Sequence, residues 1–69
     1  MNQNDLVLEY LNEFGSITQR EAAAELGIMR LASRISDLKK AGFEFDRKMI
    51  PVKTRYGTTA YVARYTMVQ

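Results

Sequence analysis

The 69-residue chain contains neither cysteine nor histidine. The lack of cysteine excludes a disulfide framework and a thiolate metal site, and it is typical of a protein in a reducing compartment. The lack of both residues removes the commonest catalytic acid-base and nucleophilic groups and the usual ligands of transition metals. We therefore expect a cytoplasmic protein that is not an enzyme and that binds no metal or other cofactor.

Long apolar runs are missing as well. No segment approaches the roughly 20 consecutive apolar residues that span a bilayer. The N-terminal stretch MNQNDLVLEY has no basic region followed by an apolar one, as an export signal would have. The sequence therefore predicts neither membrane association nor export.

Carboxylates offer a catalytic alternative only as two helical pairs, Glu9 with Glu13 and Glu21 with Glu25. A pair that acts as acid and nucleophile needs an apolar pocket that raises the pKa of one member. We expect both pairs on the polar faces of helices, in a domain too small for a deep cleft. They do not change the expectation that the protein lacks enzymatic activity.

The length leaves room for a single domain over residues 1–69, because a chain this short buries only about 60% of the surface that its unfolded form exposes. Hydrophobic residues make up 46% of the sequence and proline occurs once, which places the chain among folded proteins rather than disordered ones. We expect a compact core and unaided folding.

Charge is divided unequally along the chain. Up to Gly27 five acidic residues stand against one arginine, whereas from Ile28 onward nine basic residues stand against three acidic ones, and none of the acidic residues follows Asp46. A domain polarised in this way presents one end to a polyanion and would repel it at the other. Clustering of ordinary solvated charges by chance is the alternative explanation.

The first 27 residues predict two helices. Val7, Leu11 and Phe14 form an apolar stripe for a helix over about residues 5–14, with Asn4 as its cap. A second helix is predicted over about 19–26. It begins with the T-x-x-E capping box at Thr18, and the glycine in position 27 ends it.

A third helix is predicted over about residues 29–41. Leu31, Ile35 and Leu38 share one face, which we expect to point into the core, and Gly42 is a suitable end. Its first residue stays undetermined, because no Ser, Thr, Asp or Asn cap follows the preceding glycine.

Beyond this helix, aromatic and β-branched residues predict a hairpin over about 43–67 with a turn at Thr54–Gly57. Pro51 cannot donate a ladder hydrogen bond, so its strand is expected at an edge or at a bulge. Ser16 and Ile17 are expected to add a short third strand.

These periods also predict which side chains point inward. The residues expected to be mostly buried are Leu11, Phe14, Leu26, Leu31, Ile35, Leu38, Phe45 and Tyr65. The residues of the second hairpin strand expected to face inward are Tyr61, Ala63, Tyr65 and Met67.

The order of helix, glycine turn, helix with a basic outer face, and hairpin tipped with Lys53 and Arg55 resembles a winged helix-turn-helix domain. The stretch Arg30–Phe43, RLASRISDLKKAGF, is similar to the recognition helix and wing entry of small phage-encoded helix-turn-helix proteins. The resemblance covers about residues 5–67. It implies an α+β fold, a three-helix winged helix-turn-helix with a C-terminal antiparallel β-hairpin wing.

The resemblance also implies sequence-specific binding of double-stranded DNA. The role it suggests is that of a small phage-type or prophage-type regulator of transcription, or of an architectural (excisionase-like) factor, in the cytoplasm or nucleoid of a bacterial host. An α-helix fits the major groove, and arginine can donate two hydrogen bonds to guanine. We therefore expect Arg30 and Arg34 to read bases.

The full set of expected DNA contacts has three parts. They are Arg30, Ser33, Arg34 and Asp37 in the recognition helix, Lys53, Thr54, Arg55 and Tyr56 in the wing, and Thr18 and Lys40 on the DNA backbone. Simpler explanations remain for some of them. Arg34 can pair with Asp37 three residues on, Thr18 can act only as a cap, and Lys40 can stabilise the helix dipole.

The competing interpretation is a winged-helix module that binds or inhibits a host protein, since fold does not determine function. An acidic patch formed by Glu9, Glu13, Glu21 and Glu25 supports it. A homodimer through Tyr10 and the first helix, or through the exposed hairpin edge, is also left open. RNA binding has little support, because paired exposed aromatics are not evident.

Overall fold

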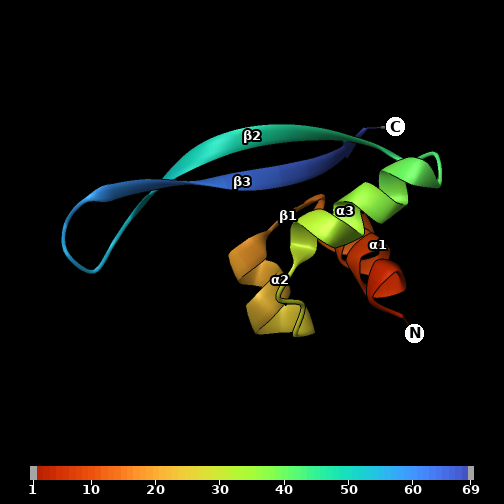
Figure 1. Ribbon diagram of the computed structural model, residues 1–69, viewed down its shortest axis with the longest axis horizontal. Helices are drawn as coiled ribbons and strands as arrows, with labels where there is room; N and C mark the ends of the chain where they lie inside the picture. The colour runs from red at the N-terminus through yellow and green to blue at the C-terminus, as the bar shows by residue number, and fades with distance from the viewer. Residues whose placement is uncertain (1, 69) are drawn as a thin grey trace.

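The computed structural model describes residues 2–68. Its elements are α1 (Gln3–Phe14), β1 (Ser16–Thr18), α2 (Gln19–Leu26), α3 (Leu31–Lys40), β2 (Glu44–Lys53) and β3 (Thr59–Val68). The helices gather beneath one end of the long β2–β3 hairpin, whose other end projects beyond them (Figure 1). The predicted α+β architecture, three helices with a C-terminal hairpin wing, is confirmed for the described residues. None of the helices within residues 2–68 is long and apolar enough to cross a membrane.

The sheet has the strand order β1-β3-β2, and both pairings are antiparallel. Ile17 lies opposite Tyr65, so the short third strand expected at Ser16 and Ile17 is present. The β2–β3 ladder runs from Glu44 opposite Val68 to Lys53 opposite Thr59. Pro51 belongs to β2, an edge strand, as its missing N–H predicts.

The core lies between α1, α3 and the base of the sheet. Its buried apolar residues are Val7, Leu11, Ile17, Ala22, Ile28, Leu31, Ile35 and Leu38, and the partly buried Leu26, Phe45, Tyr65 and Met67 pack against it. Burial of all three stripe residues of α3 confirms the helix phase predicted from the sequence. That phase decides which side chains of α3 face outward.

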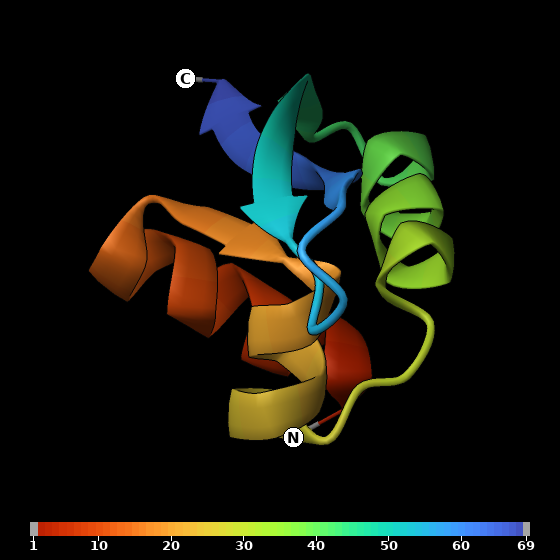
Figure 2. The same cartoon turned by 90° about the vertical axis from the view of Figure 1, so that its left-hand side faces the viewer.

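The prediction that Phe14 is buried was wrong, because its side chain is 61% exposed. Phe14 is the last residue of α1, at the end of the helix that lies farthest from α3 (Figure 2), and Gly15 turns the chain there with φ 85°. The ring packs instead on Tyr10, with ring centroids 4.6 Å apart. Val7 and Leu11 are the buried core residues of this helix, and the partly buried Leu6, Leu8 and Tyr10 pack against the same core.

The inward orientation expected for Tyr61 was also wrong, because its side chain is 64% exposed. Tyr65 and Met67, on the same face of β3, do pack against the core. Val62 and Arg64, on the opposite face, line a groove with the first turn of α2. The predicted alternation therefore holds only for the C-terminal part of the strand. Tyr61 is the third residue of β3, near the end of the strand that leads out of the wing tip.

Helix ends differ from the predicted ones for local reasons. The cap of α1 is Asn2 and not Asn4, because the Asn2 side chain accepts a 2.8 Å hydrogen bond from the Asp5 N–H. At the C-terminal end of α3, the Phe43 N–H donates to the Leu38 carbonyl, and Gly42 adopts φ 106°. This is the glycine-ended arrangement that closes many helices.

Candidate nucleic-acid interface

The start of α3 presents an exposed arginine. Arg30 is the residue that precedes the helix, its backbone is not helical, and its side chain makes no capping hydrogen bond. Within residues 2–68 it forms no ion pair. Arg30 lines an open hollow with Gly27, Ser33 and the 76% exposed Met29. The hollow places a cation and a hydroxyl at the helix end that the resemblance assigns to base reading.

Arg34 is held differently. Its guanidinium lies 3.2 Å from the Asp37 carboxylate, and about a third of its side chain is exposed. Its Nε is buried and has no hydrogen-bond partner among the described residues. The pairing that the sequence offered as the simpler explanation of Arg34 is therefore present, and it reduces the positive charge on this part of α3.

A glutamine from α2 holds the start of α3. The Gln19 amide donates a 2.7 Å hydrogen bond to the Ile28 carbonyl, and its Oε1 accepts a 2.6 Å hydrogen bond from the Leu31 N–H. Gln19 thereby supplies the cap that α3 lacks from its own sequence. Sequence reasoning missed this residue, because its partners lie 9 and 12 positions away and no capping spacing indicates them.

The wing tip is a closed turn that carries two cations. The Thr54 N–H donates to the Thr58 carbonyl at 2.9 Å, and the hydroxyls of the two threonines lie 2.6 Å apart. The Arg55 guanidinium lies 5.5 Å from the centre of the Tyr56 ring, which is 82% exposed. Lys53, the last residue of β2, is exposed as well. The tip therefore presents two cations and an aromatic ring to solvent.

The two expected backbone contacts lie in different surroundings. Thr18 is only 4% exposed, and its hydroxyl accepts from the Glu21 N–H and donates to the Glu21 carboxylate, both at 3.2 Å. Its side chain is thus occupied by the capping box, which is present as predicted. Lys40 is exposed at the C-terminal end of α3, the opposite end from Arg30.

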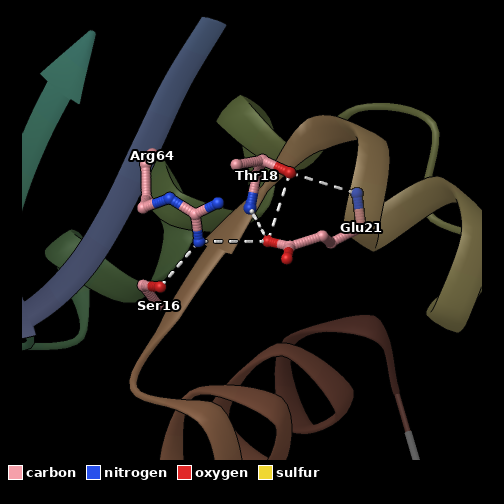
Figure 3. A network of polar contacts seen from close by, with 4 residues as sticks. All are labelled: Ser16, Thr18, Glu21 and Arg64. Atoms are coloured by element: carbon pink, nitrogen blue, oxygen red, sulfur yellow. Dashed lines mark hydrogen bonds and ion pairs between the residues drawn. The ribbon is translucent and has the colours of Figure 1, made fainter. Parts of the chain in front are cut away.

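A polar network connects β3 to the first turn of α2 (Figure 3). Arg64 donates a 2.8 Å hydrogen bond to the Ser16 hydroxyl, and the same nitrogen lies 3.5 Å from the Glu21 carboxylate. That carboxylate also accepts from the Thr18 N–H at 2.9 Å. Sequence reasoning missed this network, because Arg64 and Glu21 are 43 positions apart and only the β1–β3 pairing brings them together.

The structure leaves α3 and the wing tip as two separate basic groups. The tip projects along the long axis of the molecule, whose extents are 39 × 22 × 20 Å, while α3 lies under the other end of the hairpin (Figure 1). Between them, Arg47 and Lys48 are exposed on the edge strand β2. Sequence reasoning did not single out these two residues, although their charge and strand position were visible.

A different surface is formed by α1 and α2. Tyr10 and the exposed Phe14 lie together there. Partial burial raises the pKa of the Tyr10 hydroxyl above its ordinary value, and the Glu21 and Glu25 carboxylates raise it further. The surface is therefore aromatic and acidic, unlike that of α3 and the wing. Within residues 2–68 no group of three or more acidic side chains is placed to hold a metal ion.

Comparison with known proteins identifies the family. The profile of the family described as "Winged helix-turn-helix domain" matches residues 2–69. Comparisons with curated proteins and with solved structures gave no match. The family is one of DNA-binding folds, and the observed order of three helices and a C-terminal hairpin agrees with it. Because the profile covers nearly the whole chain, the protein belongs to the winged helix-turn-helix domain family.

Proposed function

We propose that this domain binds double-stranded DNA in a sequence-specific manner, with the start of α3 in the major groove and the wing on the sugar-phosphate backbone. The observation that carries the proposal is the exposed Arg30 directly before the first turn of α3, in one hollow with Ser33. An α-helix fits the major groove and reads bases from its N-terminal part, where an arginine can donate two hydrogen bonds to guanine.

The wing supports the same proposal through charge. Lys53 and Arg55 are exposed, and within residues 2–68 neither forms an ion pair, so both are available for phosphates or an adjacent minor groove. Tyr56 can add a contact to sugar or backbone, and Lys40 a phosphate contact at the other end of α3. Thr18 has no part in this proposal, since its hydroxyl is buried in the capping box.

Asp37 and Arg34 have a shared role in the proposal. While they remain paired, they present little net charge to DNA. Asp37 can accept a hydrogen bond from cytosine N4 and release Arg34 for a neighbouring base or phosphate. The pair is therefore a candidate for discrimination between sequences rather than for affinity.

In a cell, the proposed activity serves either regulation of transcription or DNA architecture, as in an excisionase-like factor of a phage or prophage. The two roles differ in whether binding bends DNA. A circular-permutation mobility assay on a preferred site, selected from a random library, distinguishes them. If the protein bends DNA, the gel mobility of the complex depends on the position of the site in the fragment.

The proposal is tested by fluorescence anisotropy with labelled duplexes at two salt concentrations, after selection of a preferred site from a random library. We expect binding at low salt, weakening as salt rises, and tighter binding to the selected site than to random duplex. Glu9→Ala is the control, because screening over about 8 Å at physiological ionic strength isolates this distant charge. Absence of duplex binding at low salt would overturn the proposal.

A second candidate function, binding of a protein partner, is favoured by one observation. Phe14 is 61% exposed beside Tyr10, on a surface that also carries Glu13 and Glu25. Such a surface suits a partner with basic and apolar side chains. This function gains support if substitution of Arg30, Arg34, Lys53 and Arg55 leaves duplex affinity unchanged while Glu9→Ala abolishes association with a protein.

A homodimer is a related proposal, through α1 or through the free edge of β2. A two-fold dimer would double the recognition helices and require a palindromic site. Sedimentation velocity with and without duplex distinguishes one copy per site from two.

A further inference from the structure

The first turn of α2 is bonded to both DNA-binding elements of the proposed interface. Gln19 holds the start of α3 through the Ile28 carbonyl and the Leu31 N–H, at 2.7 and 2.6 Å. Two residues on, the Glu21 carboxylate lies 3.5 Å from Arg64 of β3, the strand that leads out of the wing. One helical turn thus reaches the recognition helix on one side and the wing on the other.

The Glu21 carboxylate is itself firmly placed. Its Oε1 accepts from the Thr18 N–H at 2.9 Å and from the Thr18 hydroxyl at 3.2 Å, within the capping box. Arg64 is placed from the other side by its 2.8 Å hydrogen bond to Ser16 of β1. Figure 3 shows the four side chains converging where α2 begins beside β3. An ion pair between two groups that are already oriented loses little side-chain entropy, so it holds better than a free surface pair.

Beyond Arg64 the wing has little else to rest on. The space between the first turn of α2 and the hairpin is an open groove of about 270 Å³, lined on the hairpin side by Ile50, Val52 and Val62. These side chains are only partly buried. A two-stranded hairpin without a packed face is flexible by itself. The Arg64 contacts are therefore the outermost polar support of the wing on the helices within residues 2–68.

We propose that the first turn of α2 is a joint that sets the position of the wing relative to the recognition helix, with Gln19, Glu21 and Arg64 as positioning residues. The proposal rests on the proposed DNA binding, because its consequence is that α3 and the wing meet the duplex together. A wing held in place binds with less loss of conformational freedom than a mobile one. The joint therefore acts on affinity for the site without contacting bases.

Glu21→Gln separates this role from helix capping. Glutamine at this position of a capping box still offers an oxygen to the Thr18 N–H, but it loses the charge that attracts Arg64. Glu25→Gln is the matched control, since it removes the same charge one turn later in α2 from an exposed residue without an ion pair among the described residues. Loss of an acidic charge by itself should favour DNA binding slightly in both variants.

The position of the wing is measured directly by the distance distribution between two spin labels. The chain contains no cysteine, so Ser36→Cys on α3 and Thr59→Cys at the outer end of β3 give two unique labelling sites, both exposed. We expect Glu21→Gln to broaden the distribution and Glu25→Gln to leave it as in the parent. Arg64→Met should broaden it as well, and Arg64→Lys should restore part of the narrow distribution.

Affinity supplies the second measurement, on chains without labels. We expect Glu21→Gln to weaken binding to the selected site by about threefold to tenfold, within the range of coupling between connected residues. The effect of Arg55→Ala should be smaller in the Glu21→Gln background than in the parent. A change in fold stability alone would not produce this coupling, and thermal unfolding of both variants provides the check.

The outcomes separate the two proposals. If Glu21→Gln matches Glu25→Gln in distance distribution and affinity, the joint is overturned. If the distribution broadens but affinity and the Arg55→Ala effect do not change, the joint has no role in binding and the inference also fails. If the parent chain binds no duplex, the proposed function fails instead, and the label distances still decide whether the joint holds the wing.

Discussion

Arg30 and Arg34 lie about one helical turn apart, but only Arg30 extends from the start of α3 without an ion pair among the described residues. Both were expected from the sequence to read bases. Their different surroundings now give them different expected contributions. Arg30 can offer its guanidinium without breaking an ion pair, whereas Arg34 must first exchange Asp37 for a DNA group.

Arg30→Ala is predicted to weaken binding to the selected site by about 1–3 kcal/mol and to relax the preference at one base position. The reason is the loss of a two-hydrogen-bond contact to guanine. Anisotropy titrations against the selected site and its single-base variants measure both effects. A uniform loss on every duplex would show that Arg30 contacts only phosphate.

Asp37→Asn is predicted to tighten binding to random duplex by about 0.5–1 kcal/mol, the size of an exposed charge interaction. The substitution removes a negative charge from the helix proposed to approach DNA and frees Arg34 from its ion pair. The same titration, with random duplex at low salt, is the measurement. Unchanged or weaker binding to random duplex would contradict this prediction.

Tyr10→Phe is predicted to change how stability depends on pH in the alkaline range. The folded pKa of Tyr10 is raised above its ordinary value of about 10, first by burial and then by Glu21 and Glu25. The unfolded chain therefore loses this proton at a lower pH, and the folded protein loses stability as pH rises beyond about 10. Urea unfolding at pH 8 and at pH 10.5 should show a larger loss for the parent than for the variant.

At the scale of the elements, local signals in the sequence were sufficient for both ends of α2 and for the C-terminal end of α1, but not for the starts of α1 and α3. The capping box at Thr18, the glycine ends and the apolar stripe of α3 depend only on residues within about two turns. Phe14 was misplaced because periodicity gives the direction of a side chain but not how far the neighbouring elements extend. Gln19 and Arg64 were missed because their partners are remote in sequence and near in space.

Gln19→Met is predicted to destabilise the fold by about 1–3 kcal/mol, although the two side chains have similar lengths. Methionine cannot accept from the Leu31 N–H or donate to the Ile28 carbonyl, so both groups lose their partners in a partly buried place. Thermal and urea unfolding measure the loss. Arg20→Met, on an exposed neighbour in α2, is the control and should stay within about 0.5 kcal/mol of the parent.

For the wing, Lys53→Ala and Arg55→Ala are each predicted to weaken specific and random duplexes alike. Each should reduce the slope of log affinity against log salt by about 1, because one phosphate contact is lost. Titrations at several salt concentrations give the slope. An effect confined to one base position would mean that the tip reads sequence instead.

At the scale of the whole molecule, the unequal charge of the sequence becomes two surfaces. The aromatic and acidic one belongs to α1 and α2, and the basic one to α3 and the hairpin. The sequence was enough for the fold class and for the exposed cations at Arg30, Lys53 and Arg55. It could not supply the separation of the two basic groups along a 39 Å molecule, since that depends on how far the hairpin projects.

Binding of duplex DNA by α3 and the wing can be followed residue by residue in an NMR titration of the ¹⁵N-labelled chain with the selected duplex. We expect the amide signals of residues 30–37 and 53–56 to shift or broaden first, while those of α1 stay in place. Shifts confined to α1 and the exposed face of α2, or no shifts at low salt, would contradict it.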